Sequence, residues 1–129
     1  MADQSDVRRI ALSLPGTSET DGRFAFSVSA GGKPKGFAWV WMERVEPRKP
    51  RVPNHEVLAV RVADLEEKEL LLESNPDALF TEPHYNGFPA VLVRLAAIDP
   101  GALEELLVEA WYCQAPSSLR AAFEEQDGL

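Results

Sequence analysis

The sequence predicts an α+β fold: one two-layer domain in which helices cover one face of an antiparallel sheet. First, side-chain type alternates from one residue to the next along residues 24–29, 37–41 and 56–62. Every second residue would then share one face, which is the period of a β-strand. Second, short or hairpin-like connections join these segments, and that favours an antiparallel meander. Third, apolar stripes with helical spacing lie on both sides of this block, each with recognisable start or stop signals.

The first helix is expected over residues 5–14. Ser5 is its predicted N-cap, because its hydroxyl can accept a backbone N–H, and Asp6 follows where the helix dipole favours an anion. A single apolar stripe follows, made of Val7, Ile10, Ala11 and Leu14. The Pro15-Gly16 pair ends the helix, and the polar residues 17–22 are expected to form a turn.

The second strand, residues 37–41, places Phe37, Trp39 and Trp41 on one face. This aromatic face is expected to lie in the core, and the alternative is a platform that faces a ligand. Composition predicts a hairpin loop over the glycine-rich residues 31–36.

Residues 43–54 contain three prolines and several basic side chains, so an exposed, extended loop is expected there. The second helix is predicted over residues 63–74. Asp64 and Glu67 form a start resembling a capping box. The side chains expected to supply much of its buried face are Leu65, Leu71 and Leu72.

The clearest strand is residues 90–95, with Val91, Val93 and Leu95 on one side and Ala90, Leu92 and Arg94 on the other. Residues 79–81 are expected to pair with it across the loop 83–89. Asp99 and Pro100 then open a long helix, as an N-cap followed by proline at the first helical position. The expected order is α-β-β-β-α-β-β-α, and Ser117 caps a possible final short helix.

Length and composition fit one globular domain over residues 1–129, with a core over about residues 5–122. Apolar runs are too short for a membrane span, and the polar N-terminus does not resemble a signal peptide. The single cysteine, Cys113, has no partner for an internal disulfide, which fits a cytoplasmic location. We therefore expect no membrane partner, and a monomer or weak dimer.

Charge is distributed unevenly along a chain whose formal net charge is −8. Acidic residues dominate the predicted helices, whereas residues 33–51 are basic. The basic side chains are Lys33, Lys35, Arg44, Arg48, Lys49 and Arg51. The acidic balance argues against a protein that coats nucleic acid, but the basic segment is a candidate wing for weak, salt-dependent DNA binding.

No catalytic or metal site is expected. His55 and His84 lack partners at the spacing of metal ligands, and no nucleophile elbow, P-loop or dinucleotide fingerprint is present. Cys113 lies near a helix C-terminus, where the dipole opposes thiolate formation, so it is expected to be a packing residue. We therefore predict a chain that is not an enzyme and needs no cofactor.

The loop 83–89 is the strongest candidate for a ligand or partner surface. It contains two prolines and three aromatic rings, counting the imidazole, so it is expected to be rigid and to lose little entropy on binding. The candidate surface combines this loop with the second strand. Its predicted residues are Trp39, Trp41, His84, Tyr85, Asn86 and Phe88.

Several segments, taken in order, resemble the MmcQ/YjbR family of small bacterial proteins. They are ALSLPGTSE at 11–19, FAW at 37–39, PHYNGFPAVLVRL at 83–95, and the helix from Asp99 to near Trp111 followed by Ala115-Pro116. The resemblance implies a compact antiparallel sheet with helices on one face, related to double-wing DNA-binding domains and secretion-chaperone-like folds. It implies no catalytic or metal-ligand motif. Residues 43–54 depart from the family pattern by being longer and richer in proline and arginine.

Three functions follow from these observations. The first is a non-catalytic binding or interaction module for a protein or small ligand. The second is a DNA-binding protein that uses residues 33–51 as a wing. The third is a small-ligand sensor or enzyme whose site has no recognised motif.

Overall fold

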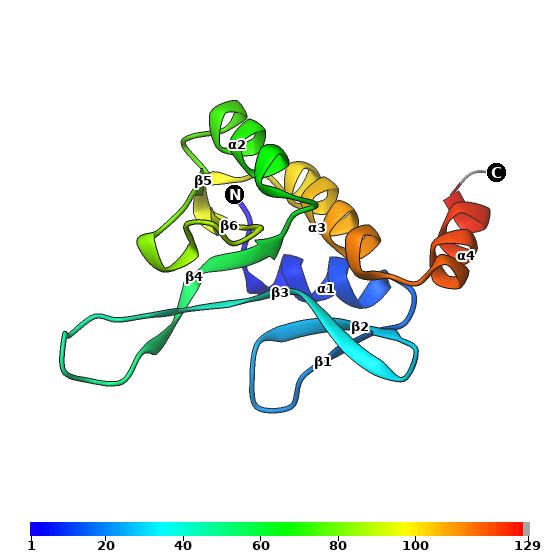
Figure 1. The fold of residues 1–129 in the computed structure, drawn as a ribbon, viewed down its shortest axis with the longest axis horizontal. Coiled ribbons are helices and arrows are strands. Elements are labelled where there is room, and N and C mark those ends of the chain that lie inside the picture. The colour runs from blue at the N-terminus through cyan, green and yellow to red at the C-terminus, as the bar shows by residue number, and fades with distance from the viewer. Residues whose placement is uncertain (128–129) are drawn as a thin grey trace.

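The structure, a computed structural model, describes residues 1–127 (Figure 1). The last two residues of the predicted domain, 128 and 129, lie outside this description. The helices are α1 (Gln4–Ser13), α2 (Leu65–Ser74), α3 (Pro100–Gln114) and α4 (Ser117–Asp127), with two short 3-10 helices, η1 (Pro83–Tyr85) and η2 (Leu95–Ala97). The strands are β1 (Thr17–Glu19), β2 (Ala25–Ala30), β3 (Lys33–Glu43), β4 (Val52–Arg61), β5 (Leu79–Phe80) and β6 (Ala90–Arg94).

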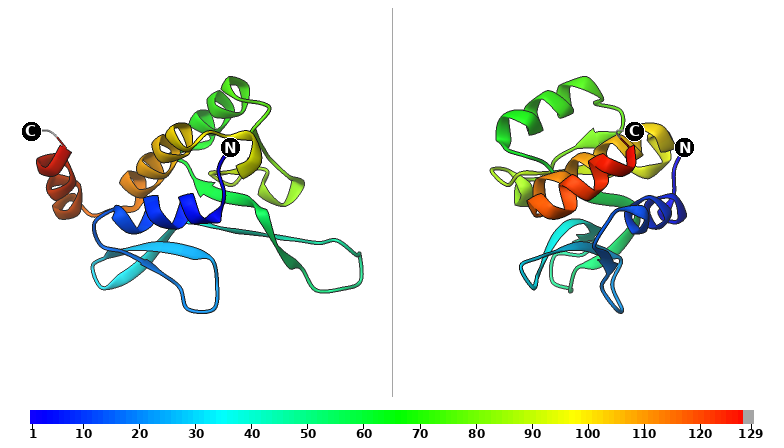
Figure 2. Two further views of the ribbon diagram at one scale, coloured as in Figure 1. Left: turned by 180° about the vertical axis from the view of Figure 1, so that it is seen from behind. Right: turned by 90° about the vertical axis from the view of Figure 1, so that its right-hand side faces the viewer.

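The strands form one antiparallel sheet in the order β1-β2-β3-β4-β6-β5. The predicted meander is present as β2, β3 and β4, and β5 pairs with β6 through Leu79 and Val93. Helices α1 and α3 lie across one face of the sheet, α2 packs beside β5 and β6, and α4 extends beyond the end of α3 (Figures 1 and 2). The α+β fold is therefore confirmed.

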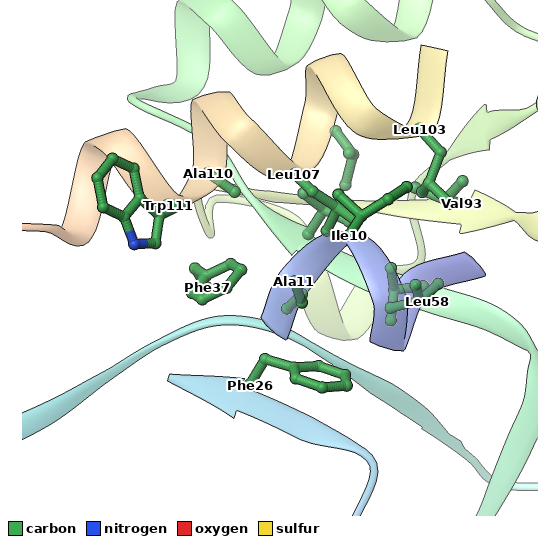
Figure 3. Packing of buried hydrophobic residues seen from close by; sticks show 14 of the residues in the cluster. Ile10, Ala11, Phe26, Phe37, Leu58, Val93, Leu103, Leu107, Ala110 and Trp111 are labelled. Atoms are coloured by element: carbon green, nitrogen blue, oxygen red, sulfur yellow. The ribbon is translucent and has the colours of Figure 1, made fainter. Parts of the chain in front are cut away.

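The main core fills the space between the sheet and the pair α1 and α3. Figure 3 shows Ile10 and Ala11 of α1 beside Leu103, Leu107 and Ala110 of α3, above side chains of the sheet. Alternation along β6 sends Val91 and Val93 into this core, as predicted. The stripes expected for α1 and α3 thus meet the same face of the sheet.

Helix α1 begins at Gln4, so the prediction that Ser5 is its N-cap was wrong. Asp3 caps the helix instead, because its carboxylate accepts a hydrogen bond from the Asp6 N–H at 3.1 Å. The Asp6 carboxylate in turn accepts from the Asp3 N–H at 3.1 Å. This reciprocal box satisfies two backbone donors, whereas a cap at Ser5 would leave the first turn unformed.

Helix α3 begins as predicted, and it provides a direct stability test. The Asp99 carboxylate accepts from the Ala102 N–H at 2.9 Å. Asp99→Ala is expected to lower the free energy of unfolding by about 1 kcal/mol, because a helix N–H loses its acceptor. Asp99→Asn should cost less, since the amide oxygen still accepts. Urea melts measure both variants, and equal stability of Asp99→Ala and the parent would contradict the assignment of this cap.

Two predictions about the first hairpins need correction. Residues 17–19, expected as a turn, form strand β1, because Thr17 to Glu19 pair with β2 and continue the sheet. The turn between β2 and β3 is also shorter than the expected loop 31–36. Within residues 31–36, only Gly31 and Gly32 adopt positive φ, at 61° and 83°, which closes a two-residue hairpin and lets β3 begin at Lys33.

The three aromatic residues of β3 do not share one face. Phe26 pairs with Ala38, whereas the neighbouring Ser27 pairs with Gly36, so Phe37 is an extra, bulged residue. A bulge changes the direction in which a side chain points. Phe37 is consequently fully buried in the main core, whereas Trp39 and Trp41 belong to the opposite face.

The exposed loop predicted over residues 43–54 is present as residues 44–51, while residue 43 and residues 52–54 at its two ends extend the sheet. Strand β3 continues to Glu43 and β4 starts at Val52, so only residues 44–51 connect them. Pro53 is tolerated because this hairpin projects from the body of the molecule, beyond the other strands (Figures 1 and 2). The paired residues 41–43 and 52–54, together with the connection 44–51, form a protruding hairpin with a basic tip, here called the β-arm.

Candidate functional site

The face of the sheet opposite α1 and α3 carries a second, smaller apolar cluster. Its buried members are Trp41, Val57, Ala59 and Leu92, and Trp39, Phe80 and Tyr85 pack against them. The Trp41 side chain meets the edge of Phe80, with ring centroids 6.1 Å apart. Trp41 is therefore buried, as expected for a core residue, but in this smaller cluster and not in the main core; a ligand-facing role for the tryptophans stays a prediction.

The loop 83–89 lies on this second face, and three of the predicted site residues meet there. The Tyr85 hydroxyl accepts a hydrogen bond from the Trp39 indole N–H at 2.9 Å. Phe88 approaches both rings, with centroids 5.9 Å from Tyr85 and 6.4 Å from Trp39. The ring of Phe88 is partly exposed, and the Arg61 guanidinium lies 5.5 Å from its centroid.

Lys68 of α2 holds this loop in place, and sequence reasoning missed its role. The side chain is buried, and its ammonium donates to the carbonyl oxygens of Tyr85 at 2.6 Å and Phe88 at 2.9 Å. Burial lowers the pKa of Lys68 from its usual value, because removal from water disfavours the charged form.

The expected burial of Leu65 was wrong, since Leu65 is 47% exposed.

The available signal for Lys68 was its isolation as a single basic residue in the acidic segment 64–82. Long-range hydrogen bonds to loop carbonyls, however, have no sequence signature. An amphipathic pattern assigns charged residues to the solvent side of a helix, so it favoured leucines over lysine for the buried face.

A hollow of about 310 Å³ lies where the base of the β-arm meets η1. Its lining residues are Trp41, Glu43, Arg44, Arg51, Glu82, Pro83 and His84. The fold thus brings together Trp41 and His84, from the predicted ligand surface, with Arg44 and Arg51, from the predicted nucleic-acid surface. Nothing in the sequence separation of these residues indicated that they would meet.

The hollow is rich in hydrogen-bond donors. The buried indole N–H of Trp41 has no acceptor among residues 1–127. Arg51 donates to the Met42 carbonyl at 3.0 Å and Arg44 to the Lys49 carbonyl at 3.0 Å, so backbone contacts orient both guanidinium groups. The Glu43 carboxylate already accepts from the Asn54 side chain at 3.0 Å.

The remaining predicted site residues lie apart from the hollow. Lys33 and Lys35 are at one end of β3 and the arginine-rich tip is at the other, about 30 Å away along an extended strand. The predicted basic region is therefore two separate patches rather than one wing. Asn86 is exposed and follows η1, where its N–H bonds to the Pro83 carbonyl, so its observed contact stabilises the turn.

His55 and Cys113, the other reactive side chains considered in the sequence, lie apart from the hollow. His55 meets Gln4 at 3.3 Å near α1, far in sequence from His84. Burial and the nearby Glu109 raise the pKa of the Cys113 thiol above its usual value, which disfavours the nucleophilic thiolate. Within residues 1–127, no group of three or more His, Cys, Asp or Glu side chains is placed to hold a metal ion. None of the helices described is long and apolar enough to cross a membrane.

Comparison with known proteins relates both the sequence and the fold to earlier examples. Residues 12–113 match the model of the YjbR family. The uncharacterized proteins Rv2570 of Mycobacterium tuberculosis and Mb2600 of Mycobacterium bovis are each 39% identical over 131 residues, covering 99% of this chain and 100% of theirs. A crystal structure of Deinococcus radiodurans protein DR2400, a DUF419 domain, superposes with a TM-score of 0.62 at 24% identity, over 86% of this chain and 77% of that one. The last likeness concerns the fold, whereas the family match covers residues 12–113 and the mycobacterial relatives match nearly the whole sequence. The chain therefore belongs to the YjbR family.

Proposed function

We propose that the chain is a non-catalytic binding module whose ligand site is the hollow between the β-arm and η1. The ligand that fits it best is a single planar or aromatic ring bearing an anionic group, carried by a small molecule or by a partner protein. A volume of about 310 Å³ is at the lower end of ligand pockets, so one ring and one anionic group would fill it.

The observation that carries this proposal is the indole N–H of Trp41. The group is buried and lacks an acceptor among the described residues, although Trp41 lines a hollow that a ligand can enter. A buried donor without an acceptor costs about 1–3 kcal/mol, and a ligand oxygen would remove that cost.

Charge and rigidity also support an anionic ligand. Arg44 and Arg51 are held by backbone carbonyls, and guanidinium groups bind planar anions in a bidentate manner. The hollow also contains two carboxylates, Glu82 and Glu43, which accepts from Asn54, so its formal charges balance and the oriented guanidinium donors, rather than a net charge, would bind the anion. The opposite wall is η1, a loop that Lys68 already orders, so little entropy is lost on binding.

Titration with phenyl phosphate tests the proposal. The indole N–H signals of the three tryptophans report separately by ¹⁵N NMR, because Trp39 donates to Tyr85 and Trp111 to Pro15, whereas the Trp41 N–H has no acceptor among the described residues. We expect a saturable shift that is largest for Trp41. Release of phenol during the titration is followed in parallel, because hydrolysis would favour the enzymatic alternative.

A matched pair of double variants locates the binding. Arg44→Ala with Arg51→Ala removes the two cations of the hollow, and we expect at least about tenfold weaker binding, since charge-assisted hydrogen bonds are lost. Arg48→Ala with Lys49→Ala removes equal charge from the same hairpin outside the hollow, and should have less than about twofold effect. Equal weakening by both pairs, or a Trp41 signal that does not move, would contradict the proposal.

DNA binding is the second candidate, and the separation of the two basic hairpin tips favours it. The tips project from opposite ends of β3, about 30 Å apart, which is close to one turn of B-form DNA. With a 20-base-pair duplex, four phosphate contacts would give a slope of about −3.6 for log affinity against log salt. If the chain binds DNA, the pair Arg44→Ala with Arg51→Ala and the pair Arg48→Ala with Lys49→Ala should weaken DNA binding equally. Absence of DNA binding in dilute salt would exclude this candidate.

A further inference from the structure

A groove of about 580 Å³ lies between α2 and α3. Leu71 of α2, Leu106 of α3 and Ile98, which follows η2, contribute to its apolar lining. Cys113 lies along the same wall near the end of α3. Leu71 and Leu106 are only partly buried, so the groove presents apolar surface that neither helix covers completely.

One stripe of α3 lines the groove along most of that helix. The stripe consists of Ala102, Glu105, Leu106, Glu109 and Cys113. These positions follow the spacing of one helix face and extend over about 16 Å, or about three helical turns. A parallel stripe of α2, from Glu67 to Ser74, forms the facing wall. An elongated groove between two helices has the shape that receives a third helix.

Its polar border is acidic. Glu67, Glu105 and Glu109 are exposed, and none of them forms an ion pair within the described part of the chain. Arg61 also lines the groove, but its guanidinium lies over the ring of Phe88. The border therefore carries three carboxylates against one arginine that is already engaged.

We infer that this groove docks an amphipathic helix with a basic polar face, supplied by a partner protein. Leucine-like side chains of the partner, spaced three and four residues apart, would cover Leu71 and Leu106. Lysine or arginine side chains beside them would meet the carboxylates of Glu67, Glu105 and Glu109. The apolar floor supplies affinity and the acidic walls select the charge of the partner. This docking surface is independent of the hollow, because the two share no lining residue.

The probe for this inference is an 18-residue amphipathic peptide of leucine and lysine, compared with a scrambled peptide of the same composition. Calorimetry measures affinity, and circular dichroism measures helix formed on binding. We expect the amphipathic peptide to bind the full chain and become helical, whereas the scrambled peptide binds at least about tenfold more weakly, because its leucines cannot share one face.

Two charge-reversal pairs form the matched control. Glu67→Lys with Glu105→Lys changes one carboxylate on each wall, and should weaken peptide binding about tenfold, since two attractions become repulsions. Glu69→Lys with Glu104→Lys makes the same change in net charge on the same two helices at exposed positions that do not line the groove. This second pair should have less than about threefold effect at 150 mM salt, where screening limits distant charges.

Cys113 reports where the peptide binds. It is the single cysteine of the chain, and the bound peptide should slow its alkylation by N-ethylmaleimide at pH 8.5 at least about fivefold, in proportion to occupancy. Equal weakening by the two charge-reversal pairs, or unchanged alkylation at saturation, would overturn the inference by showing diffuse electrostatic attraction. Spermidine binding as tightly as the peptide would also overturn it, because a site for small cations needs no helix.

Discussion

Replacing Trp111 with alanine is expected to lower the free energy of unfolding by about 3–5 kcal/mol. The indole is fully buried and packs against Phe123 of α4, with ring centroids 5.2 Å apart. Its N–H also donates to the Pro15 carbonyl at 2.9 Å, which joins the end of α3 to the turn after α1. The substitution therefore leaves a large cavity and removes the contact that connects three helices.

Urea denaturation followed by far-UV circular dichroism measures this loss. Trp111→Phe keeps most of the apolar volume and loses the hydrogen bond, so it should cost less than Trp111→Ala. The matched control is Trp39→Ala, because Trp39 lies in the thinner second cluster and is only partly buried. If Trp111→Ala lowers the free energy of unfolding by less than about 2 kcal/mol relative to the parent, the end of α3 is not packed as described.

Replacing Lys68 with methionine is expected to cost about 2 kcal/mol and to loosen the loop 83–89. Methionine has a similar length but no donor, so the carbonyls of Tyr85 and Phe88 each lose one hydrogen bond. Hydrogen exchange should become faster across residues 85–88, while exchange in β6 stays slow because its ladder is unchanged.

Lys33→Met is the matched control for this substitution, since Lys33 is exposed at a hairpin and donates to no loop carbonyl among the described contacts. It should leave both stability and exchange close to those of the parent. If exchange across the loop is equally slow in Lys68→Met, the prolines order the loop without help from α2, and the proposed role of Lys68 is wrong.

The contribution of Lys68 should also depend on pH in a defined direction. Burial lowers its pKa in the folded state, whereas the unfolded chain keeps a value of about 10.4. Between these two values the unfolded state binds more protons, so the stability contributed by Lys68 rises with pH. Below both pKa values Lys68 is charged in the folded and the unfolded state, so the folded state bears the full free-energy cost of burying the charge. The neutral amine still has two N–H groups for the two carbonyls.

We therefore expect the difference in unfolding free energy between the parent and Lys68→Met to increase in favour of the parent as pH rises from 7 toward 10. Paired melts at each pH cancel the titration of the other groups. A difference that stays constant, or that decreases, would contradict burial of the ammonium.

The sequence determined the elements whose signals are local. The alternation of residues 90–95 correctly assigned the faces of β6, and Asp99-Pro100 correctly marked the start of α3. Side-chain period, capping and proline geometry act within a few residues, so they can be read without knowing the fold. The resemblance in residues 11–19 and 83–95 led to the family, and the comparisons confirmed it.

The tertiary structure alone decided the features that depend on residues far apart in the chain. The bulge at Phe37 separates it from Trp39 and Trp41, and it exists because β2 and β3 pair in two registers. Lys68 can be buried because carbonyl oxygens 17 and 20 residues away accept hydrogen bonds from its ammonium group. The hollow forms where Arg44 and Arg51 of the β-arm lie beside η1. Register, long-range hydrogen bonds and the meeting of distant loops depend on the whole packing arrangement, and no local pattern encodes them.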